Sequence, residues 1–235
     1  VDLLKRVLDL LGEDPAALNA LGHIYAIQEN WMDLVAVLER EVAVSDDDSM
    51  RLKIYGDLGR TWSGKLRRDR NALESWERAL DIDPAHTDAL FAIAEIHRNA
   101  DATSDLIDTL HRIIDVGAAT LEDAVIEGVY VQLGGIYETK LQQPGDAIEA
   151  YRQALELNPR NFPVMDALER IHVAEAQWEE CVEVKNKRVE ALQEQSRKIA
   201  ILLEVEAGFE EKLEAPERIH DPLHKVLALE PLHEH

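Results

Sequence analysis

The sequence carries one pattern of large and small residues twice, with the copies 75 residues apart. The first copy runs from Tyr55 to Pro84 and the second from Tyr130 to Pro159. A fainter third copy runs from Leu202 to Pro231, with Glu206 in place of a glycine. A random sequence would not keep such a pattern in phase, so the recurrence predicts a chain built from repeated structural units. The paired positions are Tyr55 and Tyr130, Leu58 and Leu133, Gly59 and Gly134, Trp62 and Tyr137, Ala72 and Ala147, Trp76 and Tyr151, Ala79 and Ala154, and Pro84 and Pro159.

The residue types in each copy are those of two closely packed helices. Ala72 and Ala79 are seven residues apart and share one helix face, with Trp76 between them. Gly59 costs about 1 kcal/mol of helix propensity, which a close helix–helix approach must offset. Pro84 ends the second helix because proline has no backbone N–H to donate. One such pair cannot bury its apolar face alone, so we expect the pairs to stack.

The pattern resembles the tetratricopeptide repeat, whose signature is W-x2-L-G-x2-Y…A-x3-F…P. One departure is that Tyr137 and Ala147 are one residue further apart than in the family, as are Trp62 and Ala72. We therefore expect an insertion in the loop between the two helices of both copies. The resemblance implies an all-α fold, a right-handed superhelical solenoid of antiparallel helix pairs with about thirteen helices.

The expected organisation is a single solenoid over residues 1–235. Two repeat types alternate along the chain. One type carries the insertion and the closing proline, and the other carries neither. The other type runs into a longer second helix or a linker, and residues 189–198 contain no helix breaker. Both ends fall within a repeat, so we expect a segment of a longer array. The predicted parts are a trailing helix (1–14) and repeats at 15–48, 49–84, 85–120, 121–159, 160–196 and 197–231.

The chain is acidic, with 47 acidic against 25 basic residues and a formal net charge of −22. This charge argues against nucleic acid and anionic membranes as partners, and it is compatible with a protein partner of basic or mixed charge. No apolar stretch approaches the roughly 18 residues that span a bilayer. No secretory segment opens the sequence, which weakly favours the cytoplasm. Cys181 is the single cysteine, and we expect it to be a small buried residue.

No catalytic motif stands out in the sequence. There is no glycine-rich phosphate loop, no G-x-S-x-G and no H-E-x-x-H. His220 and His224, with Glu217, could face a metal ion from one helix, but nothing nearby completes such a site. His97 and His172 fall at a tyrosine position of the repeat, and we expect them in the core or the groove. The sequence therefore predicts a non-enzymatic protein without a cofactor or metal.

The resemblance implies that the first helices of the repeats line a concave groove that holds a partner segment. Phe91, Val131 and Gly135 would form its apolar middle. The arrangement by which some family members clamp a partner's terminal carboxylate is missing. The main hypothesis is therefore a scaffold that binds a protein or peptide segment, and the alternative is a structural spacer or self-assembling rod. The candidate groove positions are Asn19, His23, Lys53, Arg60, Phe91, Glu95, Arg98, Val131, Gly135, Glu138, Asp166 and Arg170.

The densest basic run lies where the first insertion is expected. It consists of Lys65, Arg67, Arg68 and Arg70. One interpretation is a solvated loop. The other is a contact for an acidic segment, such as that of a neighbouring copy.

Overall fold

The computed structural model describes residues 1–211, and these are helical without a strand. The chain divides into two compact units, Val1–Val116 and the part from Gly117 onward, which are described separately below. The expected all-α class is confirmed, with twelve α-helices in the described residues against the roughly thirteen expected for the whole chain. The α-helices are α1 (Asp2–Leu11), α2 (Pro15–Ile27), α3 (Trp31–Val44), α4 (Asp48–Arg60), α5 (Asp69–Ile82), α6 (Thr87–Asn99), α7 (Thr103–Gly117), α8 (Asp123–Ile136), α9 (Pro144–Leu157), α10 (Phe162–Ala174), α11 (Trp178–Ala191) and α12 (Gln195–Glu211).

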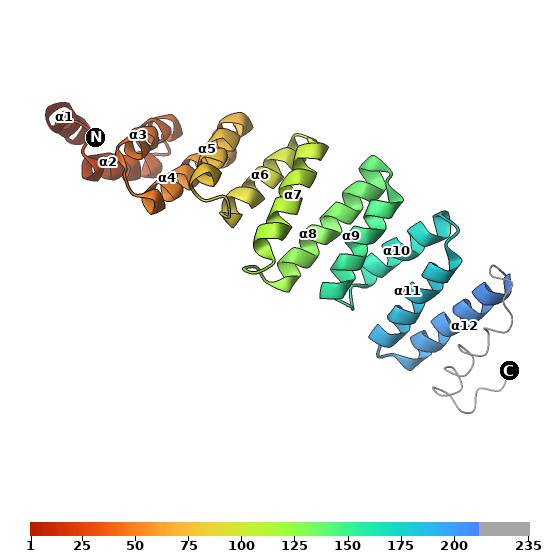
Figure 1. The fold of residues 1–235 in the computed structure, drawn as a ribbon. Helices are drawn as coiled ribbons and strands as arrows, with labels where there is room; N and C mark the ends of the chain where they lie inside the picture. The colour runs from red at the N-terminus through yellow and green to blue at the C-terminus, as the bar shows by residue number, and fades with distance from the viewer. Residues whose placement is uncertain (212–235) are drawn as a thin grey trace. The chain divides into compact units, whose positions relative to one another are not determined.

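Successive helices pack against one another within each unit. In the first unit, α2 packs on α3 and α4 on α5, and α3 and α5 also contact the next helix along the chain. In the second unit, α8 packs on α9 and α10 on α11, as the neighbouring ribbons in Figure 1 show. The buried side chains come from the faces that these helices share, including Leu21, Trp76 and Tyr151. The predicted pairing of helices is therefore present in both units.

Gly59 and Gly134 stand where an aromatic ring of the second helix packs directly on the first helix. A Cβ atom added to Gly59 would lie 2.4 Å from Cε2 of Trp76, and one added to Gly134 would lie 2.5 Å from Cε1 of Tyr151. Real Cβ contacts are not that short, so no larger residue fits without movement of the aromatic ring. Gly22 differs, because its added Cβ would lie 3.6 Å from the nearest atom, Cδ1 of Leu34.

The extra residue of the two inserted repeats lies at the end of the first helix and not in the loop. Each first helix ends in a π-helical turn, η1 (Thr61–Lys65) after α4 and η2 (Tyr137–Leu141) after α8. In η1 the backbone N–H of Leu66 donates to the carbonyl oxygen of Thr61 at 3.1 Å. A π turn absorbs one additional residue while the helix continues, so the expected position of the insertion was wrong.

The turn inside each helix pair contains one residue with left-handed backbone geometry. None of these residues is glycine, although glycine adopts this geometry at the lowest cost. They are Glu29, Arg67, Asp101, Gln142 and Ala176, with φ between 52° and 55°. The geometry lets the next residue return to the first helix, for example through the Gln177 N–H, which donates to the carbonyl of His172 at 2.8 Å.

At residues 189–198 we expected either a longer second helix or a linker. Helix α11 ends at Ala191, and Leu192 is extended, with ψ of 150°. After a short connection, α12 places Ile199 and Leu202 in a buried cluster against Val189. The linker is therefore the outcome here and the longer helix does not form, because packing of an apolar face contributes more to helix stability than local propensity does. Residues 118–122 form the linker between α7 and α8, one of the two expected outcomes there.

Candidate partner-binding surface

The first unit contains a cavity of about 360 Å³ lined by α2, α3, α4 and η1. Four of the predicted groove positions line it. Asn19 and His23 come from α2, and Lys53 and Arg60 come from α4. The structure thus brings together candidates that are up to about forty residues apart in the sequence, as expected for the first helices of consecutive repeats.

The floor of this cavity is apolar. Leu34 and Leu38 of α3 and Ile54 of α4 line it, and all three are buried in the helix packing. Met50 lines the cavity and is 42% exposed. Trp31 also lines it and is half-buried. An apolar floor with a few polar groups directed toward it is typical of a ligand site.

Some of the polar side chains around the cavity already have a hydrogen-bond partner among the described residues, and others do not. Asn19 Nδ2 donates to Oε1 of the buried Glu41 at 3.3 Å. Arg60 Nη2 donates to Asp57 Oδ1 at 2.9 Å, and its guanidinium lies 5.7 Å from the Trp76 ring centroid.

Lys53 and His23 are exposed and make no polar contact with the other residues that the structure describes. Lys65, the last residue of η1, places its Nζ atom 4.9 Å from the Trp31 ring centroid, a cation–π distance. The cavity therefore has an unpaired lysine and imidazole on its first-helix side and a lysine held over an indole ring at its edge.

The candidates on α6 share one face of that helix but do not line the cavity. Phe91 is half-buried, and Glu95 forms an ion pair with Arg98 one turn later. Ion pairs of this kind between exposed side chains contribute little to stability.

In the second unit, the charged groove candidates Glu138, Asp166 and Arg170 bind other side chains of the protein. Glu138 of η2 accepts hydrogen bonds from the Tyr151 hydroxyl at 3.0 Å and from Arg170 Nε at 2.9 Å. Burial and, to a smaller extent, the hydrogen bond to Glu138 raise the pKa of Tyr151 to about 12. Because Arg170 lies on α10, this contact ties one helix pair to the next. Asp166 is likewise engaged, in an ion pair with Arg188 of α11.

The predicted apolar middle of the groove is divided between the two units. Phe91 belongs to the first unit, and Val131 and Gly135 belong to the second. Val131 is half-buried and packs against the core cluster around Tyr151, and Gly135 is half-buried beside it. The assignment of these three residues to one surface stays a prediction.

The sequence reasoning missed a charged cluster in the second unit. Glu169 of α10 lies 3.7 Å from Lys185 Nζ, and its Oε1 atom lies 3.3 Å from Arg188 Nε, both on α11. Lys185 also pairs with Glu204 of α12. Burial raises the pKa of Glu169, and the two cations partly oppose this effect. Repeat spacing identifies helix faces but not which charges meet, so no sequence signal pointed to this cluster.

Of the two histidines and the cysteine predicted for the core, His172 and Cys181 are buried. His172 is fully buried, and its Nδ1 atom is 2.7 Å from Gln177 Oε1, whereas His97 is half-buried. Cys181 is buried, and this burial raises the pKa of its thiol. His220 and His224 lie outside the described residues.

Within residues 1–211, no group of three or more histidine, cysteine, aspartate or glutamate side chains could hold a metal ion. A search of the same residues for a helix with the length and apolar character needed to cross a membrane found none.

Comparison with known proteins identifies the class of protein that this architecture represents. A family model described as "Tetratricopeptide repeat" matches residues 128–161, which contain the second copy of the pattern. The chain is 23% identical over 168 residues to "Anaphase-promoting complex subunit 7" of Arabidopsis thaliana, covering 71% of this chain and 28% of that protein. It is 26% identical over 153 residues to "Protein NPGR2" of Arabidopsis thaliana, covering 64% of this chain and 20% of that protein. The chain thus spans about a quarter of the length of the curated relatives it matches.

Among solved structures, a tetratricopeptide repeat protein from Parabacteroides merdae superimposes with a TM-score of 0.52 and 13% identity, covering 91% of this chain and 79% of that one. This likeness concerns the fold. Residues 128–161 thus match the tetratricopeptide repeat, and the chain has the all-helical fold of proteins built from such repeats. Proteins with this fold generally mediate protein–protein interaction and act as non-enzymatic scaffolds.

Proposed function

We propose that this protein is a non-enzymatic scaffold and that the cavity between α2 and α4 holds a segment of a partner protein. The observation that carries the proposal is the meeting of Asn19, His23, Lys53 and Arg60 around an apolar floor. These four positions were selected from the repeat pattern as groove positions, independently of the cavity.

The cavity fits one apolar side chain of an extended segment better than a complete small molecule. Its volume of about 360 Å³ is at the lower end of the range for ligand pockets. Leu34 and Ile54 would contact the apolar side chain, while Lys53 and His23 are free to bond to the backbone carbonyls or polar groups on either side. Partner segments of this kind gain affinity from a central apolar anchor surrounded by polar contacts.

The test is a peptide selection followed by a titration. Peptides displayed on phage are selected against the protein, and the best peptide is titrated while the fluorescence of the protein's four tryptophans is recorded. Because Trp31 lines the cavity, its emission should change on binding, and Trp31→Phe should remove most of this change. Replacing both His23 and Lys53 by glutamate should weaken binding at least tenfold, which corresponds to about 1.4 kcal/mol.

The matched control replaces two exposed residues on the second helix of the next pair, Glu77→Lys and Arg78→Glu on α5. This change should leave the peptide affinity within about twofold. Equal losses in the two double variants would contradict the assignment to this cavity. A selection that yields no binder, together with light scattering that rises steeply with protein concentration, would favour the spacer or self-assembling rod.

A further inference from the structure

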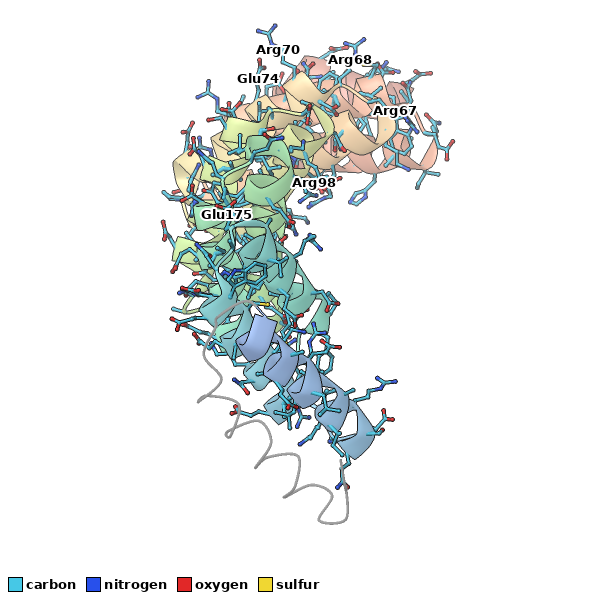
Figure 2. All side chains as sticks on the ribbon, turned by 90° about the vertical axis from the view of Figure 1, so that its right-hand side faces the viewer. Arg67, Arg68, Arg70, Glu74, Arg98 and Glu175 are labelled. Carbon is cyan, nitrogen blue, oxygen red and sulfur yellow. The ribbon has the colours of Figure 1, made fainter. Side chains whose placement is uncertain are left out.

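The turn between η1 and α5 presents three arginines on a strongly acidic chain. We call Arg67, Arg68 and Arg70 the basic turn, and all three are exposed. Figure 2 shows these side chains around the turn, with Glu74 nearby. Only 25 of the 235 residues are basic, so three within four positions form a local exception to the net charge of −22.

The chain itself shows that these arginines are not needed to build the turn. The second inserted repeat forms the same structure, a π turn followed by a left-handed residue and a new helix. Its residues at the three equivalent positions are Gln142, Gln143 and Gly145. Arg67 and Gln142 have nearly the same backbone, with φ of 52° and 54°. The second turn therefore has the same backbone without the positive charge.

The contacts of the basic turn neutralise only part of its charge. The Arg68 N–H donates to the carbonyl oxygen of Trp62 at 2.8 Å, and its guanidinium lies 5.9 Å from the Trp62 ring centroid. Arg70 lies 3.6 Å from Glu74, but its side chain is 91% exposed. Arg67 makes no polar side-chain contact within the described part of the chain. Guanidinium groups presented in this way can bind carboxylates with two hydrogen bonds each.

We infer that the basic turn is a second docking surface and that it binds an acidic segment of a partner protein through its carboxylates. A short acidic segment meets only the turn, because charges more than about 8 Å away are largely screened at physiological salt. A longer polyanion such as nucleic acid would extend over the acidic surface of the protein and be repelled. The surface is separate from the residues that make the floor of the α2–α4 cavity.

The test copies the second turn into the first. A variant with Arg67→Gln, Arg68→Gln and Arg70→Gly has at these positions the residues of the chain's own second turn, so its fold should be retained, as circular dichroism can verify. A fluorescein-labelled oligoglutamate peptide is the probe, and its anisotropy is measured at low and at physiological salt. The triple variant should bind it about tenfold more weakly than the unchanged protein at low salt.

The control removes three cations elsewhere, with Arg152→Gln, Arg160→Gln and Lys187→Gln in the second unit. It changes the net charge equally and should leave oligoglutamate binding unchanged. An equal loss in this control, or no oligoglutamate binding at low salt, would overturn the inference. Tighter binding of a single-stranded oligonucleotide of equal charge through the same arginines would overturn it too. So would self-association of the unchanged protein that the triple variant loses, because the occupant would then be a second copy.

Discussion

Replacing Gly134 by alanine should destabilise the protein even though alanine is the better helix former. The added Cβ would lie 2.5 Å from Cε1, 2.6 Å from Cδ1 and 2.9 Å from Cζ of Tyr151. Carbon atoms in contact prefer separations of about 3.5–4.0 Å, so the ring would have to move by roughly 1 Å. Tyr151 is only 6% exposed, and its hydroxyl is bonded to Glu138, which restricts that movement.

The opposing free energies decide the sign of this effect. Alanine gains about 1 kcal/mol of helix propensity over glycine. Overpacking of a core costs about 1–3 kcal/mol, and a weakened hydrogen bond to the Glu138 carboxylate costs about 1.5–3 kcal/mol. The net expectation for Gly134→Ala is a loss of about 1.5–5 kcal/mol in the free energy of unfolding, measured by urea denaturation with circular dichroism.

Gly22→Ala is the matched control, because its added Cβ would be 3.6 Å from the nearest atom. It should gain up to about 1 kcal/mol. In a Tyr151→Leu background the steric conflict at Gly134 is removed, and Gly134→Ala should become neutral or stabilising. If Gly134→Ala proved as stable as Gly22→Ala in the unchanged background, the close-approach explanation for the repeat glycine would be refuted.

Three further predictions concern the turns and the buried polar groups. Ala176→Gly should stabilise the protein by about 1 kcal/mol in urea denaturation, because alanine occupies left-handed geometry there with φ of 54°; a loss would contradict this. The pKa of Glu169 is raised above 4.5 in the folded state, so the folded state binds more protons and stability should fall as the pH rises through and above 4.5. Glu169→Gln should flatten this fall in urea midpoints between acidic and neutral pH, and an unchanged slope would show that burial of Glu169 is not its cause. Tyr151→Phe should cost about 1.5–3 kcal/mol through the lost bond to Glu138, and it should remove the phenol that titrates at about pH 12 in absorbance measurements, whereas an unshifted phenol near pH 10 would contradict the contact.

The sequence predicted the fold because the repeat constrains every level of it. Gly59 and Trp76 recur as Gly134 and Tyr151 since the glycine and the aromatic ring touch in both of these helix pairs, so their spacing reports on a contact. The same spacing identified Asn19 and Lys53 as residues on neighbouring first helices, and both line one cavity.

Other features could not be read from the spacing. The left-handed turn residues include Arg67 and Ala176, which carry none of the usual glycine signal. The π turns arise because an extra residue is absorbed in the helix, and a sequence with one added residue is equally compatible with a longer loop. Residues 189–198 have good local helix propensity, yet packing of α12 on α11 ends the helix at Ala191.

Charge pairing between helices was the least predictable part. Glu138 and Arg170 are 32 positions apart and were both assigned to a partner groove, but they bind each other. The repeat pattern places both on first helices, whereas rotamers and the exact helix offset decide whether they meet. The pair therefore joins two helix pairs in the second unit, and the available groups lie in the first unit, around Lys53.

Site-specific photocrosslinking of the selected peptide is the most direct test of the central claim that a partner segment binds on the first helices. The photoreactive residue benzoylphenylalanine is placed at His23, which lines the cavity on α2, or at Glu77, which is exposed on α5. If the segment binds there, the peptide should crosslink to position 23 and not above background to position 77. A crosslink from position 77 alone would contradict it.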